Sequence, residues 1–121
     1  MSQDDYEPIA DAELPHAVAT YLAAHRAKDA GTASEQFTEA AVVVDDGHTH
    51  TGRAEIDAWL GRSSSEYTYT TTLLRSGRLD AAHYRAVQRL EGNFPGGVVD
   101  LCYSFALQDG TISELVIEPE V

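Results

Sequence analysis

The spacing of apolar residues changes part-way along this chain, and the change limits the folds that the chain can adopt. In the first part, side chains that suit a core recur every three or four positions, which is typical of one face of a helix. The clearest run consists of Leu14, Val18, Tyr21, Leu22 and His25. Thr32 and Glu35 have capping-box spacing and predict a short second helix. A third helical segment, residues 53–60, is predicted to stop at Gly61. In the last part, apolar and polar residues alternate, which is typical of strands.

Five segments are predicted to be strands because they are rich in β-branched and aromatic residues and are bounded by turn residues. These segments are residues 41–45, 67–75, 84–91, 98–107 and 111–117. Ser76-Gly77 is predicted to form the turn after the second of them. Helices that come first and long antiparallel strands that follow predict an α+β fold, with the helices on one side of a curved sheet.

The length of 121 residues fits one domain, since typical domains hold about 100–150 residues. No repeat, low-complexity tract or linker divides the sequence. Residues 1–10 are predicted to be a flexible leader, because Asp4, Asp5 and Glu7 offer nothing to bury. Residues 11–121 are therefore predicted to form a single domain.

The net charge of the chain limits the kinds of molecule that it can bind. Twenty acidic residues against eight basic ones give a formal net charge of −12, which repels phosphate groups and disfavours nucleic acids and anionic membranes. The single cysteine, Cys102, excludes an internal disulfide and a cysteine-rich zinc site. The acidic N-terminal residues lack the positive charge and apolar run of a secretory signal, so a cytoplasmic location is expected.

Three segments of the sequence are similar to a known family. They are residues 21–29 (YLAAHRAKD), 37–45 (FTEAAVVVD) and 52–56 (GRAEI). With the order of elements over residues 14–118, they resemble the nuclear-transport-factor-2-like (NTF2-like) superfamily, in the branch of SnoaL-like polyketide cyclases and steroid delta-isomerases. The resemblance implies a cystatin-like cone, in which a curved antiparallel sheet wraps around about three helices. It also implies an apolar pocket and a homodimer, while the fold itself hosts many activities.

The same resemblance implies two catalytic residues. In the steroid isomerases, a tyrosine of the first helix donates a hydrogen bond to the substrate carbonyl, and a carboxylate at the end of the first strand moves the proton. Tyr21 and Asp45 fall on these two positions. A phenol in a dry pocket can stabilise the charge on an enolate oxygen, and a carboxylate in apolar surroundings is a better base than a solvated one.

A third catalytic position differs from the isomerase pattern. The isomerases use a protonated aspartate as a second donor, and Tyr103 stands at that position here. Asp100 is predicted to lie on the opposite face of the strand and cannot replace it simply. Tyr103 is predicted either to donate a second hydrogen bond or to serve only as a wall of the pocket.

The predicted substrate is a small, mostly apolar molecule that contains a carbonyl group, and no cofactor is required. The predicted substrate-binding residues are His25, Val43, Trp59 and Phe105. His48 and His50 form a His-x-His pair near Asp46, but one local cluster without a second ligand-bearing segment does not define a metal site, and no metal is predicted.

A second interpretation is a non-catalytic member of the fold, which binds an apolar ligand or forms a dimeric scaffold. In this interpretation Tyr21 is a core residue with its hydroxyl at the edge of the core, and Asp45 is an ordinary strand end before a turn. The sequence by itself leaves both interpretations open, and also the choice between isomerisation, cyclisation and dehydration.

Overall fold

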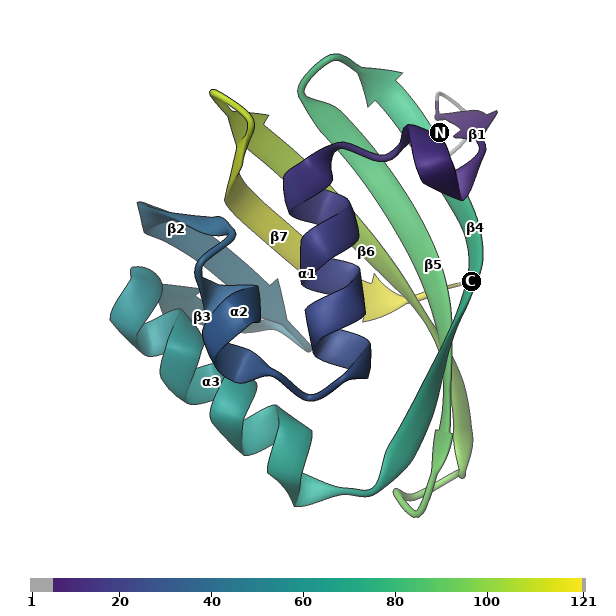
Figure 1. Ribbon diagram of the computed structural model, residues 1–121. Coiled ribbons are helices and arrows are strands. Elements are labelled where there is room, and N and C mark those ends of the chain that lie inside the picture. The colour runs from purple at the N-terminus through teal and green to yellow at the C-terminus, as the bar shows by residue number, and fades with distance from the viewer. Residues whose placement is uncertain (1–5, 121) are drawn as a thin grey trace.

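The computed structural model describes residues 6–120, apart from the side chain of Ser64 (Figure 1). Three α-helices and a short 3₁₀ helix accompany one seven-stranded sheet. The elements, in chain order, are β1 (Glu7–Ile9), η2 (Asp11–Glu13), α1 (His16–Arg26), α2 (Ala30–Ser34), β2 (Phe37–Asp45), β3 (His48–Thr51), α3 (Arg53–Glu66), β4 (Tyr69–Asp80), β5 (His83–Gly92), β6 (Val98–Gln108) and β7 (Thr111–Pro119).

The sheet is strongly curved, and the helices lie on its concave side (Figure 1). The strand order is β1-β4-β5-β6-β7-β2-β3. All neighbouring strands are antiparallel except β2 and β7, which are parallel and bring Val43 opposite Leu115. The α+β cone predicted from the sequence is confirmed, but the sheet is mixed, because the last strand enters between β6 and β2 instead of extending the meander at its edge.

The core lies between α1 and the concave face of the sheet. Val18 and Tyr21 of α1 are fully buried, and they pack with Phe37, Phe105 and Leu115 from three strands. In β6 the alternation predicted from the sequence is confirmed, since Tyr103 and Phe105 face the core. Asp100 lies on the outer face, where Arg89 Nε donates a hydrogen bond to it at 2.8 Å.

The third helix is longer than predicted, and this extension brings additional residues to the pocket. Gly61 does not end α3, which continues to Glu66. In the last turns of α3, Ser63 donates a hydrogen bond to the Leu60 carbonyl and Ser65 donates one to the Gly61 carbonyl. Such hydroxyl-to-carbonyl bonds are made within the helix and do not cap its end.

The N-terminal segment corrects two predictions. Residues 1–5 of the predicted leader lie outside the described residues, but Glu7–Ile9 form strand β1, paired with β4. Ser76-Gly77 is not a turn: Gly77 lies within β4 opposite Pro8, and an added Cβ there would lie 3.2 Å from the Tyr6 Cβ. Glycine at this position therefore allows the N-terminal strand to approach, and the chain reverses only after Asp80.

Candidate functional site

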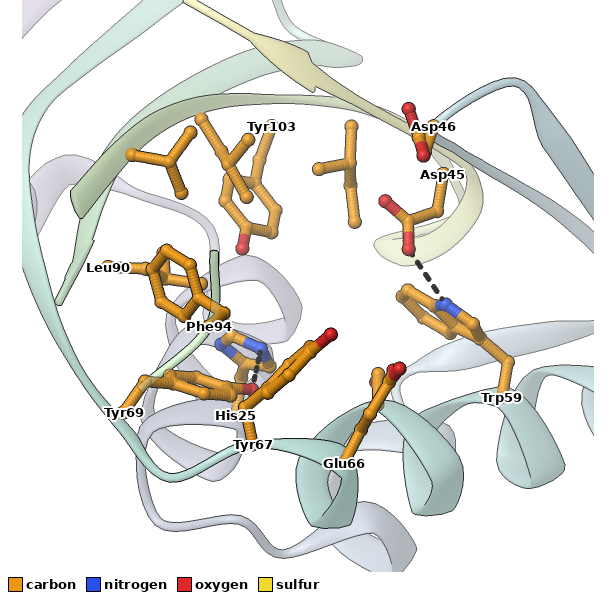
Figure 2. Close-up of a pocket in the computed structure, with 14 residues that line it drawn as sticks. His25, Asp45, Asp46, Trp59, Glu66, Tyr67, Tyr69, Leu90, Phe94 and Tyr103 are labelled. Carbon is orange, nitrogen blue, oxygen red and sulfur yellow. Dashed lines mark hydrogen bonds between the residues drawn. The ribbon is translucent and has the colours of Figure 1, made fainter. Parts of the chain in front are cut away.

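A pocket of about 300 Å³ opens between the concave face of the sheet and the C-terminal half of α3 (Figure 2). Aromatic rings and carboxylates form much of its wall. From the first half of the chain, the lining residues are His25 of α1, Asp45 and Asp46 at the end of β2, and Trp59, Ser63 and Glu66 of α3. From the second half, they are Tyr67 and Tyr69 near the start of β4, Leu90 of β5, Phe94 of the following turn, Val99, Leu101 and Tyr103 of β6, and Ile117 of β7.

Asp45 is held in the pocket by a side chain of α3. Trp59 Nε1 donates a hydrogen bond to Asp45 Oδ2 at 3.0 Å. Figure 2 shows the other carboxylate oxygen directed toward the middle of the pocket. The next two residues, Asp46 and Gly47, have φ angles of 53° and 77°, as a tight hairpin turn requires. The turn and the indole together fix one oxygen of Asp45 and leave the other free to accept a proton.

Tyr103 reaches the same pocket from β6, and Figure 2 shows its hydroxyl directed into the interior. The side chain is almost completely buried. Burial raises the pKa of the Tyr103 phenol above its usual value, and the electrostatic effects of Tyr69 and Asp45 act in the same direction. Tyr103 therefore stays protonated at neutral pH and is a neutral hydrogen-bond donor.

His25 contributes a polar side chain to the pocket wall. Its Nε2 lies 3.4 Å from the Tyr69 hydroxyl, and its ring stacks on Tyr21 with a centroid distance of 6.0 Å. Lys28 Nζ lies 3.5 Å from the centroid of the Tyr69 ring. Burial lowers the pKa of His25 to about 4, and the charges of Lys28 and Arg26 contribute to the shift. The imidazole is therefore neutral at pH 7.

The low pKa of His25 predicts a loss of stability in mild acid. The unfolded chain binds a proton at this residue below about pH 6.5, whereas the folded protein binds it only near pH 4. Between these two values the unfolded state holds more protons, so the free energy of unfolding decreases as the pH falls. We expect a loss of about 2 kcal/mol between pH 7 and pH 5, measured by urea denaturation.

The control for this prediction is His25→Gln, which removes the titrating group and keeps a polar side chain. The pH dependence of the variant should be smaller than that of the natural protein by the same amount. Equal pH dependence in the two proteins would show that His25 is not a buried neutral group.

Four of the seven side chains predicted for the site line the pocket, and three do not. His25, Asp45, Trp59 and Tyr103 line it, whereas Tyr21, Val43 and Phe105 do not. Tyr21 is fully buried, and Phe37 and Phe105 pack edge-on against its ring at centroid distances of 5.6 and 5.7 Å. Its hydroxyl has no hydrogen-bond partner among residues 6–120. Tyr21 therefore does not line the pocket, but burial raises the pKa of its hydroxyl and the charge of Asp45 contributes to the shift.

His48 and His50 lie on β3, beside the pocket and not in it. His50 stacks on Trp59 with a centroid distance of 5.6 Å, so it supports the indole that binds Asp45. Both histidines border a shallow hollow that shares Asp45, Asp46 and Trp59 with the pocket. Within the described part of the chain, no group of three or more histidine, cysteine, aspartate or glutamate residues could hold a metal ion.

Several residues that line the pocket were not predicted from the sequence. Tyr69 is the most important of them, because its hydroxyl contacts His25, and Glu66, Tyr67 and Phe94 form part of the rim (Figure 2). Tyr69 lies in a segment correctly predicted as a strand. It is two positions before Thr71, which is buried, so the alternation along the strand could have indicated that Tyr69 faces inward. The rim residues come from the helix extension and from the turn between β5 and β6, where periodicity gives no information.

Comparison with solved structures identifies the family. A protein from Sinorhizobium meliloti, provisionally called a polyketide cyclase, is 33% identical to this chain and matches it with a TM-score of 0.83. The match covers 91% of this chain and 100% of the other. The chain belongs to the NTF2-like superfamily, in its SnoaL-like and steroid delta-isomerase-like branch. This confirms the resemblance found in the sequence.

Two further structures support the NTF2-like fold. Bal32a, from a soil-derived mobile gene cassette, is 26% identical with a TM-score of 0.74, and the match covers 89% of this chain and 87% of Bal32a. A protein with a ketosteroid isomerase-like fold from Catenulispora acidiphila, solved in complex with trimethylamine, is 19% identical with a TM-score of 0.77, over 88% of this chain and 87% of that one. At this identity the second match concerns the fold alone. No family model and none of the curated proteins matches the sequence.

Among the described residues of this NTF2-like chain, none of the helices has the length and apolar character needed to cross a membrane.

Proposed function

We propose that this NTF2-like protein is a small-molecule enzyme that moves a proton on a carbon atom next to a carbonyl group. Asp45 takes the proton from the carbon, and Tyr103 donates a hydrogen bond to the carbonyl oxygen. The observation that carries the proposal is that a carboxylate with one free oxygen and a protonated phenol line the same pocket. Isomerisation, cyclisation and dehydration all contain this step.

The chemistry of the step explains why these two groups are needed together. Removing a proton next to a carbonyl places negative charge on the oxygen, and a donor already aimed at that oxygen stabilises the charge as it develops. The carboxylate of Asp45 returns the proton to another carbon or to a leaving group, so no cofactor is required. The indole N–H of Trp59 keeps the carboxylate in one orientation.

The pocket favours a small, mostly apolar substrate with a planar ring. Five aromatic side chains line its walls, which are Trp59, Tyr67, Tyr69, Phe94 and Tyr103. A volume of about 300 Å³ is at the lower end for small-molecule pockets. The description of the Sinorhizobium meliloti protein as a polyketide cyclase agrees with a substrate of this class.

The test is the exchange of protons next to the carbonyl of 2-tetralone, a bicyclic aromatic ketone, followed by proton NMR in D₂O. We expect the protein to accelerate this exchange and Tyr103→Phe to slow the catalysed rate by about 10²-fold, because one donor to the developing oxyanion is lost. Tyr6→Phe removes a hydroxyl from a side chain outside the pocket and should change the rate little. Equal rates in the natural protein and Tyr103→Phe would contradict the proposed donor.

A second candidate function is ligand binding without chemistry, in a monomer or in a dimeric scaffold. It is favoured by the absence of Tyr21 from the pocket lining, since the isomerase pattern uses a donor from the first helix at this position. Trp59 is the only tryptophan and lines the pocket, so its fluorescence reports binding directly. Binding of 2-tetralone without accelerated exchange would support this second function. The homodimer and the cytoplasmic location stay predictions from the family resemblance and from the sequence.

A further inference from the structure

Gln88 is the most unusual side chain near the pocket that the proposed reaction does not use. It lies on β5, where every second residue (Ala86, Gln88 and Leu90) faces the concave side of the sheet. Its side chain is fully buried. Neither its Nε2 nor its Oε1 has a hydrogen-bond partner among the described residues. A buried amide without partners costs stability, so a sequence optimised only for folding would carry an apolar residue here.

The neighbours of Gln88 connect it to the pocket. On the adjacent strand, Leu101 pairs with Gln88 and Tyr103 pairs with Ala86, so Gln88 and Tyr103 are diagonal neighbours on one face. The amide interacts with the Tyr103 phenol and lowers its pKa, although burial dominates and the net shift is upward. Tyr69 and Asp45, the other groups that act on the phenol, both raise its pKa.

The sheet register places the amide where a rotation of its side chain can bring an N–H to the Tyr103 oxygen. Because neither amide atom has another hydrogen-bond partner among the described residues, no existing bond has to break for this rotation. When the phenol oxygen accepts from the amide, its own proton is free for the pocket, and such a chain of hydrogen bonds strengthens the outer donor.

We propose that Gln88 is a positioning residue that directs the Tyr103 hydroxyl proton into the pocket, so that the pocket selects ligands carrying an oxygen acceptor. The inference rests on the proposed role of Tyr103 as a donor. It adds that Gln88 controls the direction of this donor, and that the pocket therefore prefers ligands with an oxygen acceptor. A ketone accepts such a hydrogen bond, and a hydrocarbon of the same shape does not.

The experiment compares the affinities of 2-tetralone and of tetralin, the hydrocarbon with the same two rings, by the fluorescence of Trp59. The ratio of the two affinities measures the hydrogen bond to the carbonyl, because a change of pocket shape affects both ligands alike. We expect Tyr103→Phe to lower this ratio about tenfold. Gln88→Met, which keeps the length of the side chain, should lower the ratio about fivefold, and adding it to Tyr103→Phe should have no further effect.

The melting temperature of Gln88→Met should equal or exceed that of the natural protein, because a buried amide without partners is removed. If this variant fails to fold, Gln88→Leu replaces it in the same comparison. A ratio that falls in Tyr103→Phe but stays unchanged in the Gln88 variants would overturn the role of Gln88 alone. A ratio that stays unchanged in Tyr103→Phe would overturn both this role and the donor in the proposed function.

Discussion

Replacing Asp45 by asparagine is expected to slow the exchange of protons next to the 2-tetralone carbonyl by about 10²–10⁴-fold, the usual contribution of a positioned acid or base. The amide has nearly the same shape as the carboxylate, and its oxygen can still accept the hydrogen bond from Trp59 Nε1. It cannot take a proton from carbon. The variant should therefore fold normally, bind 2-tetralone and lose the reaction.

Asp46→Asn is the matched control, since it removes one negative charge from the neighbouring, exposed turn residue. We expect only a small change of the exchange rate in this variant. The charge of Asp46 is exposed to solvent, which screens its effect on the pocket. Full activity of Asp45→Asn, with 2-tetralone still bound, would remove the carboxylate from the mechanism.

Gly92→Ala is expected to lower the free energy of unfolding by about 3 kcal/mol or more, since an added methyl group has no space in this part of the sheet. Gly92 ends β5 opposite Tyr69, and a Cβ there would overlap the Thr68 carbonyl oxygen and lie 2.6 Å from the Tyr69 Cβ. Backbone atoms of β4 would have to move. The same movement would displace Tyr69, so binding in the pocket should weaken as well.

Gly61→Ala is the control for this substitution, and it should have the opposite sign. Gly61 lies within α3, and an added Cβ there would have no atom within 4 Å. Alanine in a helix interior is more stable than glycine by about 0.5–1 kcal/mol. Urea denaturation of both variants, followed by the fluorescence of Trp59, measures the two effects. A Gly92→Ala variant as stable as the natural protein would contradict the close approach of β4 and β5.

The fold could be predicted from the sequence because its layers follow from local periodicity. The face of α1 that contains Val18, Tyr21 and Leu22 is buried as predicted, and the strand with Tyr103 and Phe105 has the expected inward face. Positions of this kind depend on the repeat of the element itself, either 3.6 or 2 residues. The turn at Asp46-Gly47 was also predicted, since these residues tolerate positive φ angles.

The errors concern positions where a distant segment decides the local structure. Gly77 reads as a turn residue, but in the fold it accommodates Tyr6, the residue before a strand that comes about 70 residues earlier. Gly61 reads as a helix end, but in the fold α3 continues past it to Glu66. The parallel pair of β2 and β7 connects segments that are about 70 residues apart in the sequence, and no local pattern indicates this pairing.

By itself, the sequence determined that helices precede strands, that a carboxylate ends the first long strand, and that Trp59 and Tyr103 face inward. These are properties of single elements, whose period and turn residues are local. The tertiary structure decided which inward side chains reach the pocket. Asp45 and Tyr103 line it together, whereas Phe37 and Phe105 enclose the Tyr21 ring in the core. The reason is that a shared inward face does not distinguish a side chain that borders a cavity from one that packing covers, and packing depends on every element at once.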